Sequence, residues 1–416
     1  MRYPKKHFKG EVTLEGSKSI LNRVILISTL LKDKITIKNN SSCGDIKTLS
    51  ENLLKLGCKF KREKELIEIT PLQKIKDAEL YVQDSGTAFR FLLAFCANST
   101  GNNFAIDVSK QLKKRKSGEL IKLLRKMGAQ IENDKFPLLI KGRKLKGGVY
   151  KVRADISSQF ISSVLLIAPY LNENLTIKLE GKVVSKSYLK MTLAIMQKFG
   201  VKSTFNKNII IIFNDYEYQN PGFYEVEPDF SAACYFLALG ALSEKYVCVN
   251  FPFTKSIQGD YGFIKILAKF GAEIKKTENQ ICIKKQLLKG ITVDMNSLPD
   301  QVPTLAILAL FGEKKTEIKN ISQLQYKETN RILALTEELK KLDAAVSYNN
   351  DKLIIHPLKN KPPHIVLKTY NDHRMAMSFA LIKAIYPYLK IDNYKCVKKS
   401  CPKFWQDYQR ITKIEI

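Results

Sequence analysis

The chain has 416 residues, of which 45% are hydrophobic and 26% are charged, and its formal net charge is +29. This composition is typical of a globular protein with room for two domains, and the apolar runs fall short of the roughly 18 residues that a membrane span needs. Basic residues are spread over every predicted element without an RRM, helix-turn-helix or zinc-finger pattern, which favours attraction of anionic metabolites over a nucleic-acid partner. The basic N-terminus is not followed by the apolar segment of a signal peptide, so we expect a cytoplasmic protein.

The first predicted helix begins at a candidate anion site. Residues 16–19, Gly-Ser-Lys-Ser, precede an apolar run over 24–31 and therefore form the loop at a helix N-terminus. Free backbone N–H groups and the positive end of the helix dipole face outward there, and Lys18, Ser19 and Arg23 add two charges and a hydroxyl. The pattern predicts binding of a phosphate or a carboxylate, although an ordinary N-cap followed by solvated basic residues would look the same.

Predicted helix ends recur at a constant period along the chain. A glycine follows four of these ends and an aspartate follows the fifth, at a spacing of 71 or 72 residues. The positions are Gly57, Gly128, Gly200, Gly271 and Asp343. Glycine just past a helix is the usual left-handed cap, so Asp343 is the one departure. A constant period over five units predicts a repeated supersecondary structure.

Each unit also carries a second helix that is apolar on nearly all sides and is therefore predicted to be buried. These helices cover residues 89–97, 160–170, 232–242, 305–311 and 375–385. The entry at residues 16–19 is a sixth copy, and its partner helix is predicted at 402–411. The sixth unit would thus be closed by both ends of the chain.

Short β-type runs alternate with the helices. They cover residues 35–37, 66–69, 104–108, 138–140, 175–179, 209–213, 246–249, 281–283 and 352–355. This alternation predicts an α/β protein of two similar domains, each of three units with buried helices inside and sheets outside. One domain would be discontinuous, with residues 1–15 and 229–416, and the other would span residues 16–228.

The eight cysteines show neither a Cys-x-x-Cys pair nor a neighbouring His pair at ligand spacing. We therefore predict reduced, mostly buried thiols and no metal site.

Charged and hydroxyl side chains gather at the helix entries. Lys327 and Arg331 are four residues apart and share a helix face, and Arg374 begins an apolar helix. Two hydroxyls and an amide at 157–159 suit phosphate oxygens. Asp300 is an acid at a helix entry among cations, which makes it a candidate general base, although a plain N-cap would give the same pattern. So many cations and donors predict substrates with several phosphates and carboxylates.

Together these motifs resemble the family of 3-phosphoshikimate 1-carboxyvinyltransferase, also called EPSP synthase, over essentially the whole chain. The resemblance rests on residues 16–23, 85–90, 157–160, 184–188, 299–300, 327–331 and 370–377. It implies two domains of three βαβαββ units each, with parallel buried helices in an inverse α/β barrel-like arrangement. It also implies transfer of the enolpyruvyl group of phosphoenolpyruvate to the 5-hydroxyl of shikimate-3-phosphate, with release of phosphate, in aromatic amino acid biosynthesis. The two small-molecule substrates would be the partners of a monomer that needs no metal or organic cofactor and binds no membrane.

The resemblance implies a role for each matching residue. Ligands of shikimate-3-phosphate would be Lys18, Ser19, Arg23, Ser157, Ser158, Gln159, Ser185, Asp300, Gln323 and Lys327. Ligands of phosphoenolpyruvate would be Lys18, Gly86, Arg115, Gln159, Arg331, Arg374 and Lys403. Asp300 would take the proton of the 5-hydroxyl as it attacks C2, and Lys18 or Glu328 would handle the proton at C3. The discontinuous domain would hold the base and most contacts to the phosphoenolpyruvate carboxylate, and the other domain most contacts to shikimate-3-phosphate.

Several residues depart from the family pattern. Asp84 and Gln323 stand where the family usually has Asn, and a carboxylate at residue 84 should weaken anion binding unless it points away. Lys116 replaces a common proline, and Pro303 falls in the helix after Asp300, where a first turn tolerates it.

Two other functions remain alternatives. The related UDP-N-acetylglucosamine 1-carboxyvinyltransferase family uses a loop cysteine and a Lys-Asn entry, whereas Lys18 is followed here by Ser19 and residues 105–125 hold no cysteine. A basic nucleic-acid-binding repeat protein would instead spread phosphate contacts along one face.

Overall fold

The computed structural model describes residues 3–416, which divide into two compact units. Unit 1 comprises the N-terminal segment up to Glu15 together with Glu227–Ile416, and unit 2 is Gly16–Val226. The boundary between Val226 and Glu227 therefore lies two residues before the boundary predicted between residues 228 and 229. Within the described residues, no helix is both long and apolar enough to cross a membrane.

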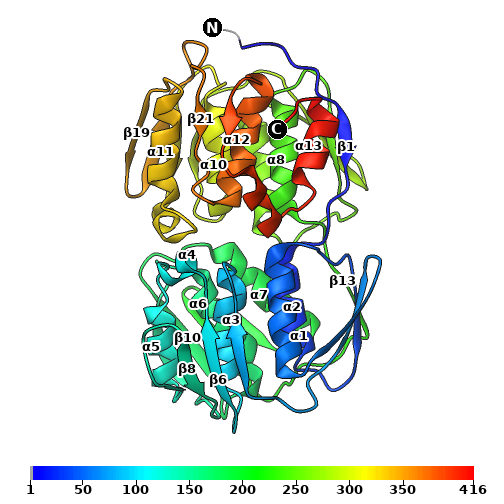
Figure 1. The fold of residues 1–416 in the computed structure, drawn as a ribbon, viewed down its shortest axis with the longest axis vertical. Helices are drawn as coiled ribbons and strands as arrows, with labels where there is room; N and C mark the ends of the chain where they lie inside the picture. Colours follow the sequence, from blue (N-terminus) through cyan, green and yellow to red (C-terminus); the bar gives the residue numbers. More distant parts are fainter. Residues whose placement is uncertain (1–2) are drawn as a thin grey trace. The chain divides into compact units, whose positions relative to one another are not determined.

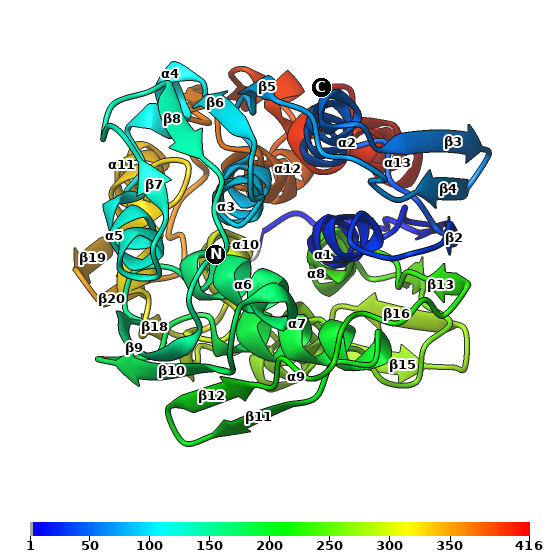
Figure 2. The same ribbon diagram turned by 90° about the horizontal axis from the view of Figure 1, so that it is seen from below.

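Unit 2 contains three four-stranded sheets around three buried helices (Figures 1 and 2). Its helices are α1 (Lys18–Ser28), α2 (Gly44–Leu56), α3 (Gly86–Ala97), α4 (Lys110–Lys113), α5 (Gly118–Lys126), α6 (Ser158–Ile167) and α7 (Lys186–Lys198). Its strands are β2 (Ile35–Lys38), β3 (Lys59–Glu63), β4 (Leu66–Thr70), β5 (Ala78–Tyr81), β6 (Asn103–Asp107), β7 (Gln130–Ile131), β8 (Leu138–Lys141), β9 (Gly148–Arg153), β10 (Leu175–Glu180), β11 (Ser203–Asn206), β12 (Ile209–Ile212) and β13 (Phe223–Glu225). The buried helices α1, α3 and α6 lie inside and the sheets lie outside, as predicted.

Unit 1 repeats the same plan with a reduced third sheet. Its helices are α8 (Phe230–Ala241), α9 (Phe263–Phe270), α10 (Val302–Ala309), α11 (Arg331–Lys341), α12 (His373–Ile385) and α13 (Phe404–Thr412). Its strands are β1 (Gly10–Val12), β14 (Val247–Asn250), β15 (Glu273–Lys276), β16 (Gln280–Lys284), β17 (Thr292–Asp294), β18 (Thr316–Lys319), β19 (Val346–Asn349), β20 (Lys352–Ile355), β21 (Val366–Leu367) and β22 (Lys390–Ile391). Helices α8, α10 and α12 are buried almost completely and form the centre of its core.

The five four-stranded sheets share one pairing pattern. Their orders are β13-β2-β4-β3, β5-β6-β8-β7, β9-β10-β12-β11, β1-β14-β16-β15 and β17-β18-β20-β19. In each sheet the first strand is parallel to the second and the other two pairs are antiparallel. The sixth sheet keeps only the parallel pair, β21-β22. The repeat predicted from the helix ends is therefore also a repeat of the sheets.

Left-handed residues end the helices at the predicted positions. Gly57 and Gly271 cap α2 and α9 with φ of 110° and 101°, and Gly128 and Gly200 also have positive φ. Asp343 has φ of 58°, so it occupies the same left-handed position without being a glycine. A short polar side chain makes that conformation accessible.

The cysteine prediction is wrong for one pair. Cys248 on β14 and Cys282 on β16 form a disulfide, because the antiparallel register places them directly opposite one another with Cα atoms 4.0 Å apart. The six other cysteines are thiols, and five of them are buried. A separation of 34 residues hides the cross-strand neighbour in the sequence.

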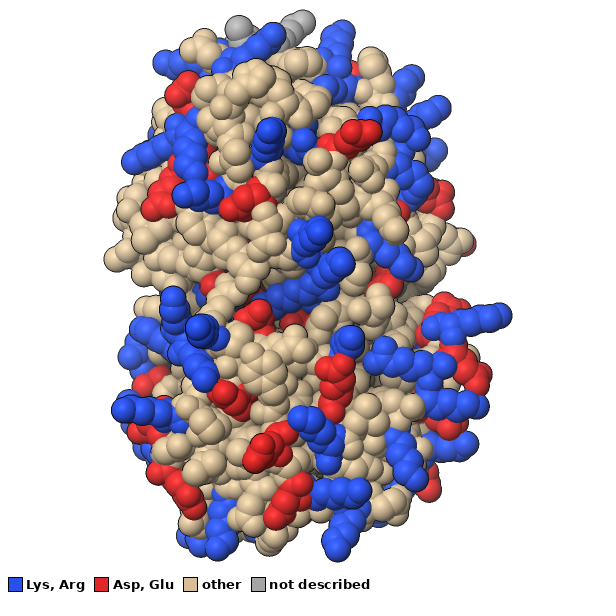
Figure 3. All heavy atoms as spheres, viewed as in Figure 1, with Lys and Arg blue, Asp and Glu red and all other residues tan. Residues whose placement is uncertain are grey.

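Basic side chains are scattered over the face drawn in Figure 3, with acidic side chains among them. Among the described residues, many acidic side chains pair with a lysine, as Glu63 does with Lys61 and Glu225 with Lys38.

Candidate functional site

Asp300 is the centre of a charged cluster in unit 1. It lies in a short 3₁₀ turn, Pro299–Gln301, directly before α10. Its Oδ1 lies 3.2 Å from Lys327 Nζ and 3.1 Å from Arg331 Nη1, and its Oδ2 lies 2.6 Å from Arg374 Nη2. Burial alone would raise the pKa of Asp300, but the charges of Arg374, Lys327 and Arg331 outweigh it and hold the pKa well below the usual range. Asp300 is thus an ionised acid with three cations, which a plain N-cap would not require.

Arg331 is shared among three carboxylates. It begins α11 and is only 1% exposed. Its Nε and Nη2 donate to the two oxygens of Asp372 at 2.8 and 3.1 Å, and Nη2 also donates to Glu328 at 3.0 Å. Asp372 is the N-cap of α12, where its Oδ1 accepts from the Arg374 backbone N–H. One buried carboxylate therefore fixes both arginines of the cluster.

Glu328 lies between two cations. Its Oε2 accepts from Arg331, and its Oε1 accepts from Lys399 Nζ at 2.9 Å. Lys399 ends a 3₁₀ segment, Tyr394–Lys399, that packs against α12. Lys399 was not among the predicted site residues, because a lysine in a lysine-rich segment carries no local signal.

A second buried acid, Asp260, lies behind Asp300. It accepts from Gln301 Nε2 at 3.0 Å and from the Ser231 hydroxyl. Burial first, and then the negative charge of Asp300, raises the pKa of Asp260. The two acids of this region therefore differ in acidity, and Asp300 is the one held in the charged form.

Gln323 and Lys403 lie outside this network of contacts. Gln323 is buried, and its Nε2 is 3.5 Å from the Asn296 carbonyl. Lys403 is 64% exposed and lies 3.5 Å from Glu15. Pro303 is in the first turn of α10, where the sequence analysis placed it.

In unit 2, Lys18 is held by a carboxylate from the next helix. Its Nζ lies 2.7 Å from Asp45 Oδ2, and Asp45 is in the first turn of α2. This acid was not among the predicted site residues. Its position one residue into the helix, after Gly44, is the only local signal that could have identified it.

Arg23 is fully buried and braces three helices of unit 2. Its Nε donates to Thr192 of α7 at 2.8 Å, Nη2 lies 3.5 Å from Ser162 of α6, and Nη1 donates to the Ser19 carbonyl. Burial lowers the pKa of Arg23 to about 10, which leaves it charged at neutral pH. Within residues 3–416 no carboxylate forms an ion pair with Arg23, and a buried cation of this kind favours an anion nearby.

The entry of α6 meets the entry of α3. Gln159 Nε2 donates to Thr87 Oγ1 at 2.9 Å, and the Ser157 hydroxyl accepts from the Gln159 backbone N–H. Ser158 is buried beside them. Ser185, the N-cap of α7, has φ of 54°, a left-handed conformation that a non-glycine residue adopts at a cost and that is common at functional sites.

Gly86 lies against the ends of two arginine side chains. A Cβ at this position would lie 2.5 Å from Nη1 of both Arg90 and Arg115. Arg90 donates to the carbonyls of Gly86 and Lys116 at 2.7 and 3.2 Å. Lys116 contributes its backbone there, so the departure from proline leaves this contact available.

The carboxylate of Asp84, between β5 and α3, bonds to a residue of a different loop. It accepts from the hydroxyl of Ser109, the N-cap of α4. Part of its negative charge is therefore directed to the Ser109 hydroxyl.

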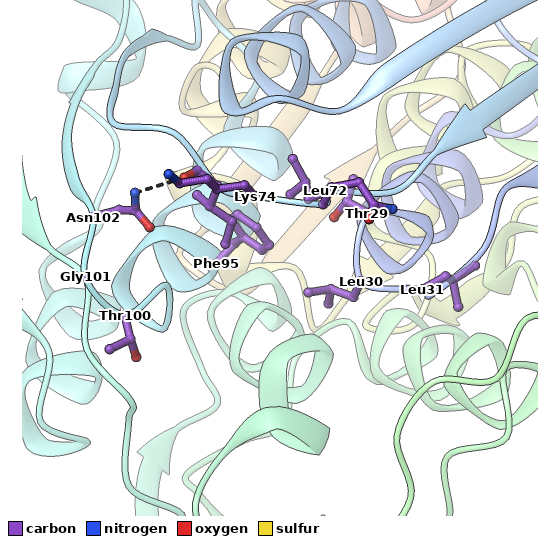
Figure 4. Close-up of a pocket in the computed structure, with 11 residues that line it drawn as sticks. Thr29, Leu30, Leu31, Leu72, Lys74, Phe95, Thr100, Gly101 and Asn102 are labelled. Carbon is purple, nitrogen blue, oxygen red and sulfur yellow. Dashed lines mark hydrogen bonds between the residues drawn. The ribbon is translucent and has the colours of Figure 1, made fainter.

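A pocket of about 560 Å³ in unit 2 lies near the C-terminal ends of α1 and α3 (Figure 4). Its lining includes residues 29–31 after α1, Phe95 in the last turn of α3, and residues 72–75 and 100–102. Lys74 is its one charged side chain. The candidate anion site is therefore at the helix N-termini and not in this pocket.

Comparison with known proteins decides the family. A family model described as EPSP synthase (3-phosphoshikimate 1-carboxyvinyltransferase) matches residues 3–408. The chain belongs to the EPSP synthase family. It is 39% identical to the 3-phosphoshikimate 1-carboxyvinyltransferase of Buchnera aphidicola subsp. Cinara cedri, over 98% of this chain and 96% of that protein. It is 36% identical to the enzyme of that name from Shewanella amazonensis, over 99% and 98%.

Solved structures show the fold of the EPSP synthase family. The EPSP synthase of Acinetobacter baumannii superposes with a TM-score of 0.79 at 22% identity, covering 99% of this chain and 97% of that chain. The enolpyruvyl transferase NikO of Streptomyces tendae gives 0.76 at 14% identity, over 99% and 96%. The predicted fold class and family are confirmed, and the UDP-N-acetylglucosamine family is the less supported alternative.

Proposed function

We propose that this chain transfers the carboxyvinyl group of phosphoenolpyruvate to the 5-hydroxyl of shikimate-3-phosphate. The 5-hydroxyl oxygen bonds to C2 while its proton passes to Asp300 and C3 gains a proton. The resulting tetrahedral intermediate then loses the C3 proton and its phosphate, which restores the double bond. The observation that carries the proposal is the Asp300 cluster, in which a candidate base contacts three cations, Lys327, Arg331 and Arg374.

The ionised state of Asp300 supports its role as the base. A base must be unprotonated before it acts, and the three cations keep Asp300 so. The same cations also make it a weak base. Binding of phosphoenolpyruvate to Arg331 and Arg374 would draw their charge toward the ligand, and the pKa of Asp300 would rise toward a value suited to proton transfer.

The remaining residues of the site divide by ligand. We assign shikimate-3-phosphate to Lys18, Ser19, Arg23, Ser157, Ser158, Gln159, Ser185, Asp300, Gln323 and Lys327. We assign phosphoenolpyruvate to Lys18, Gly86, Arg115, Gln159, Arg331, Arg374 and Lys403. The buried charge of Arg23 and the Gln159–Thr87 contact beside Gly86 support the assignments in unit 2. The assignments of Gln323 and Lys403 rest on the family motif alone.

Two groups are candidates for the proton transfer at C3. Lys18 forms an ion pair with Asp45, and Glu328 lies between Arg331 and Lys399. Lys18→Met and Glu328→Gln distinguish them through solvent-deuterium incorporation at C3, which should fail for the group that carries this proton.

The test is a steady-state assay of the purified protein with both substrates, following phosphate release and the enolpyruvyl product by mass spectrometry. We expect turnover with shikimate-3-phosphate and none with UDP-N-acetylglucosamine. Turnover with the nucleotide sugar instead would assign the chain to the alternative reaction, and tight, salt-sensitive DNA binding without turnover would favour the nucleic-acid alternative.

The proposal includes a monomeric cytoplasmic enzyme that needs no metal or organic cofactor. Full activity after exhaustive treatment with a chelator, and a gel-filtration mass near 47.5 kDa, are the expected results.

A further inference from the structure

The loop that delivers Asp372 and Arg374 has a strained backbone. Tyr370 and Asn371 both have φ of 54°, in the left-handed region that favours glycine. Such a conformation persists only where neighbouring contacts impose it. The loop lies between β21 and α12 and ends at the charged cluster.

Glu338 supplies several of those contacts from inside α11. Its side chain is 0% exposed. Its Oε2 accepts from the Lys368 backbone N–H at 2.9 Å, and its Oε1 lies 2.8 Å from the Tyr370 hydroxyl, which is shared with Glu337 Oε2 at 2.5 Å. Lys341, one turn along the helix, lies 2.7 and 2.8 Å from the two oxygens and supplies the counter-charge.

The same helix holds the other end of the loop through Arg331. Residues 331 and 338 are seven apart, or about two turns, so they lie on one face of α11. Arg331 donates hydrogen bonds to both oxygens of Asp372, while Glu338 accepts hydrogen bonds from the Lys368 backbone and the Tyr370 hydroxyl. Helix α11 therefore contacts the loop both at its start, Lys368, and at its end, Asp372, with the two left-handed residues in between.

We infer that Glu338 is a positioning residue for the arginines of the phosphoenolpyruvate site. It fixes the loop in the one conformation that places Asp372 against Arg331 and Arg374 against Asp300. Glu338 lies outside the Asp300 cluster and acts through Tyr370 and the loop backbone. The inference rests on the proposed function, since it names the substrate whose binding depends on the loop.

The kinetic test compares KM for the two substrates. In Glu338→Gln and in Tyr370→Phe we expect KM for phosphoenolpyruvate to rise roughly 10-fold, the scale of one lost hydrogen bond to a buried charge. KM for shikimate-3-phosphate should stay within about twofold of wild type. Tyr370→Phe removes only a hydroxyl, so it carries the test if Glu338→Gln does not fold.

The matched control is Lys340→Met, the same kind of truncation at an exposed lysine of α11. We expect its KM values to match wild type within about twofold, because the Lys340 side chain is exposed to solvent. An equal rise of both KM values in Tyr370→Phe, an unchanged KM for phosphoenolpyruvate, or the same rise in Lys340→Met would each overturn the inference.

A second readout does not depend on turnover. Hydrogen exchange of the Lys368 backbone amide should be faster in Glu338→Gln than in wild type, while amides in the centre of α12 keep their protection. If the wild-type protein shows no turnover with these substrates, the proposed function fails, and the exchange data still decide whether Glu338 holds the loop. Unchanged exchange at Lys368 in a folded Glu338→Gln protein would disprove the inference that Glu338 holds the loop.

Discussion

Replacing Asp300 by asparagine should abolish most turnover and spare substrate binding. The amide keeps the shape of the side chain but cannot accept the proton, and a general base contributes about 10²–10⁴-fold in rate. In the structure Asp300 neutralises part of the charge on Lys327, Arg331 and Arg374. Without that negative charge, the three cations should bind the anionic phosphoenolpyruvate at least as tightly as in wild type.

Two measurements on the same preparation test this reasoning. Phosphate release gives kcat, and calorimetric titration of phosphoenolpyruvate in the presence of shikimate-3-phosphate gives the dissociation constant. Asp215→Asn, the same substitution at an exposed aspartate, is the control and should behave as wild type. Turnover within about threefold of wild type would mean that Asp300 is not the base. A loss of phosphoenolpyruvate binding in proportion to the loss of turnover would mean that the Asp300 carboxylate positions the three cations for binding and does not act as the base.

Three further predictions follow from single contacts. In Gly86→Ala the new methyl group would lie 2.5 Å from a guanidinium nitrogen of Arg115, so this side chain must move. KM for phosphoenolpyruvate should rise by the equivalent of roughly 1–3 kcal/mol, and an unchanged KM would contradict this prediction. Asp45→Asn removes the carboxylate that holds Lys18, and breaking a buried pair costs about 3–5 kcal/mol. The melting temperature should therefore fall. Added shikimate-3-phosphate should raise the melting temperature of this variant by more than it raises that of wild type. The pKa of Asp300 lies well below its usual range in the free protein. Since kcat/KM reports the free enzyme and kcat the complex, the acid limb of kcat/KM due to this group should lie at lower pH than the acid limb of kcat. Coincident limbs would mean that substrate binding leaves the pKa of Asp300 unchanged.

The repeat and its buried helices could be predicted because each leaves a strong local signal. A glycine past a helix and an apolar run of ten residues need no knowledge of distant contacts. Strand β18 was missed because Thr-Glu-Ile-Lys has a single apolar residue, Ile318, that packs inward. The disulfide was missed because it depends on the register between β14 and β16, which only the folded sheet determines.

The cations of the site were predicted more completely than their partners. Lysines and arginines at helix entries stand out by type and position, and a family motif names them. The acids Asp45 and Asp260 and the cation Lys399 have no such pattern. Their roles arise from packing between elements that are distant in sequence, as when α2 brings Asp45 to Lys18 and a loop before α9 brings Asp260 to Gln301.

The carboxylates beside the cations of the site have a common electrostatic cause. Cations gathered at a buried site repel one another and lose their hydration, so a folded protein without ligand must supply negative charge nearby. Asp45 does so for Lys18, and Asp372 with Glu328 does so for Arg331. Arg23 differs, since it is buried with hydroxyl and carbonyl partners. An anionic substrate therefore has two effects: it competes with carboxylates for Lys18 and Arg331, whereas near Arg23 it would supply charge that the free protein lacks. For this reason we expect Arg23→Met to weaken shikimate-3-phosphate binding more than phosphoenolpyruvate binding, and equal losses for the two ligands would contradict it.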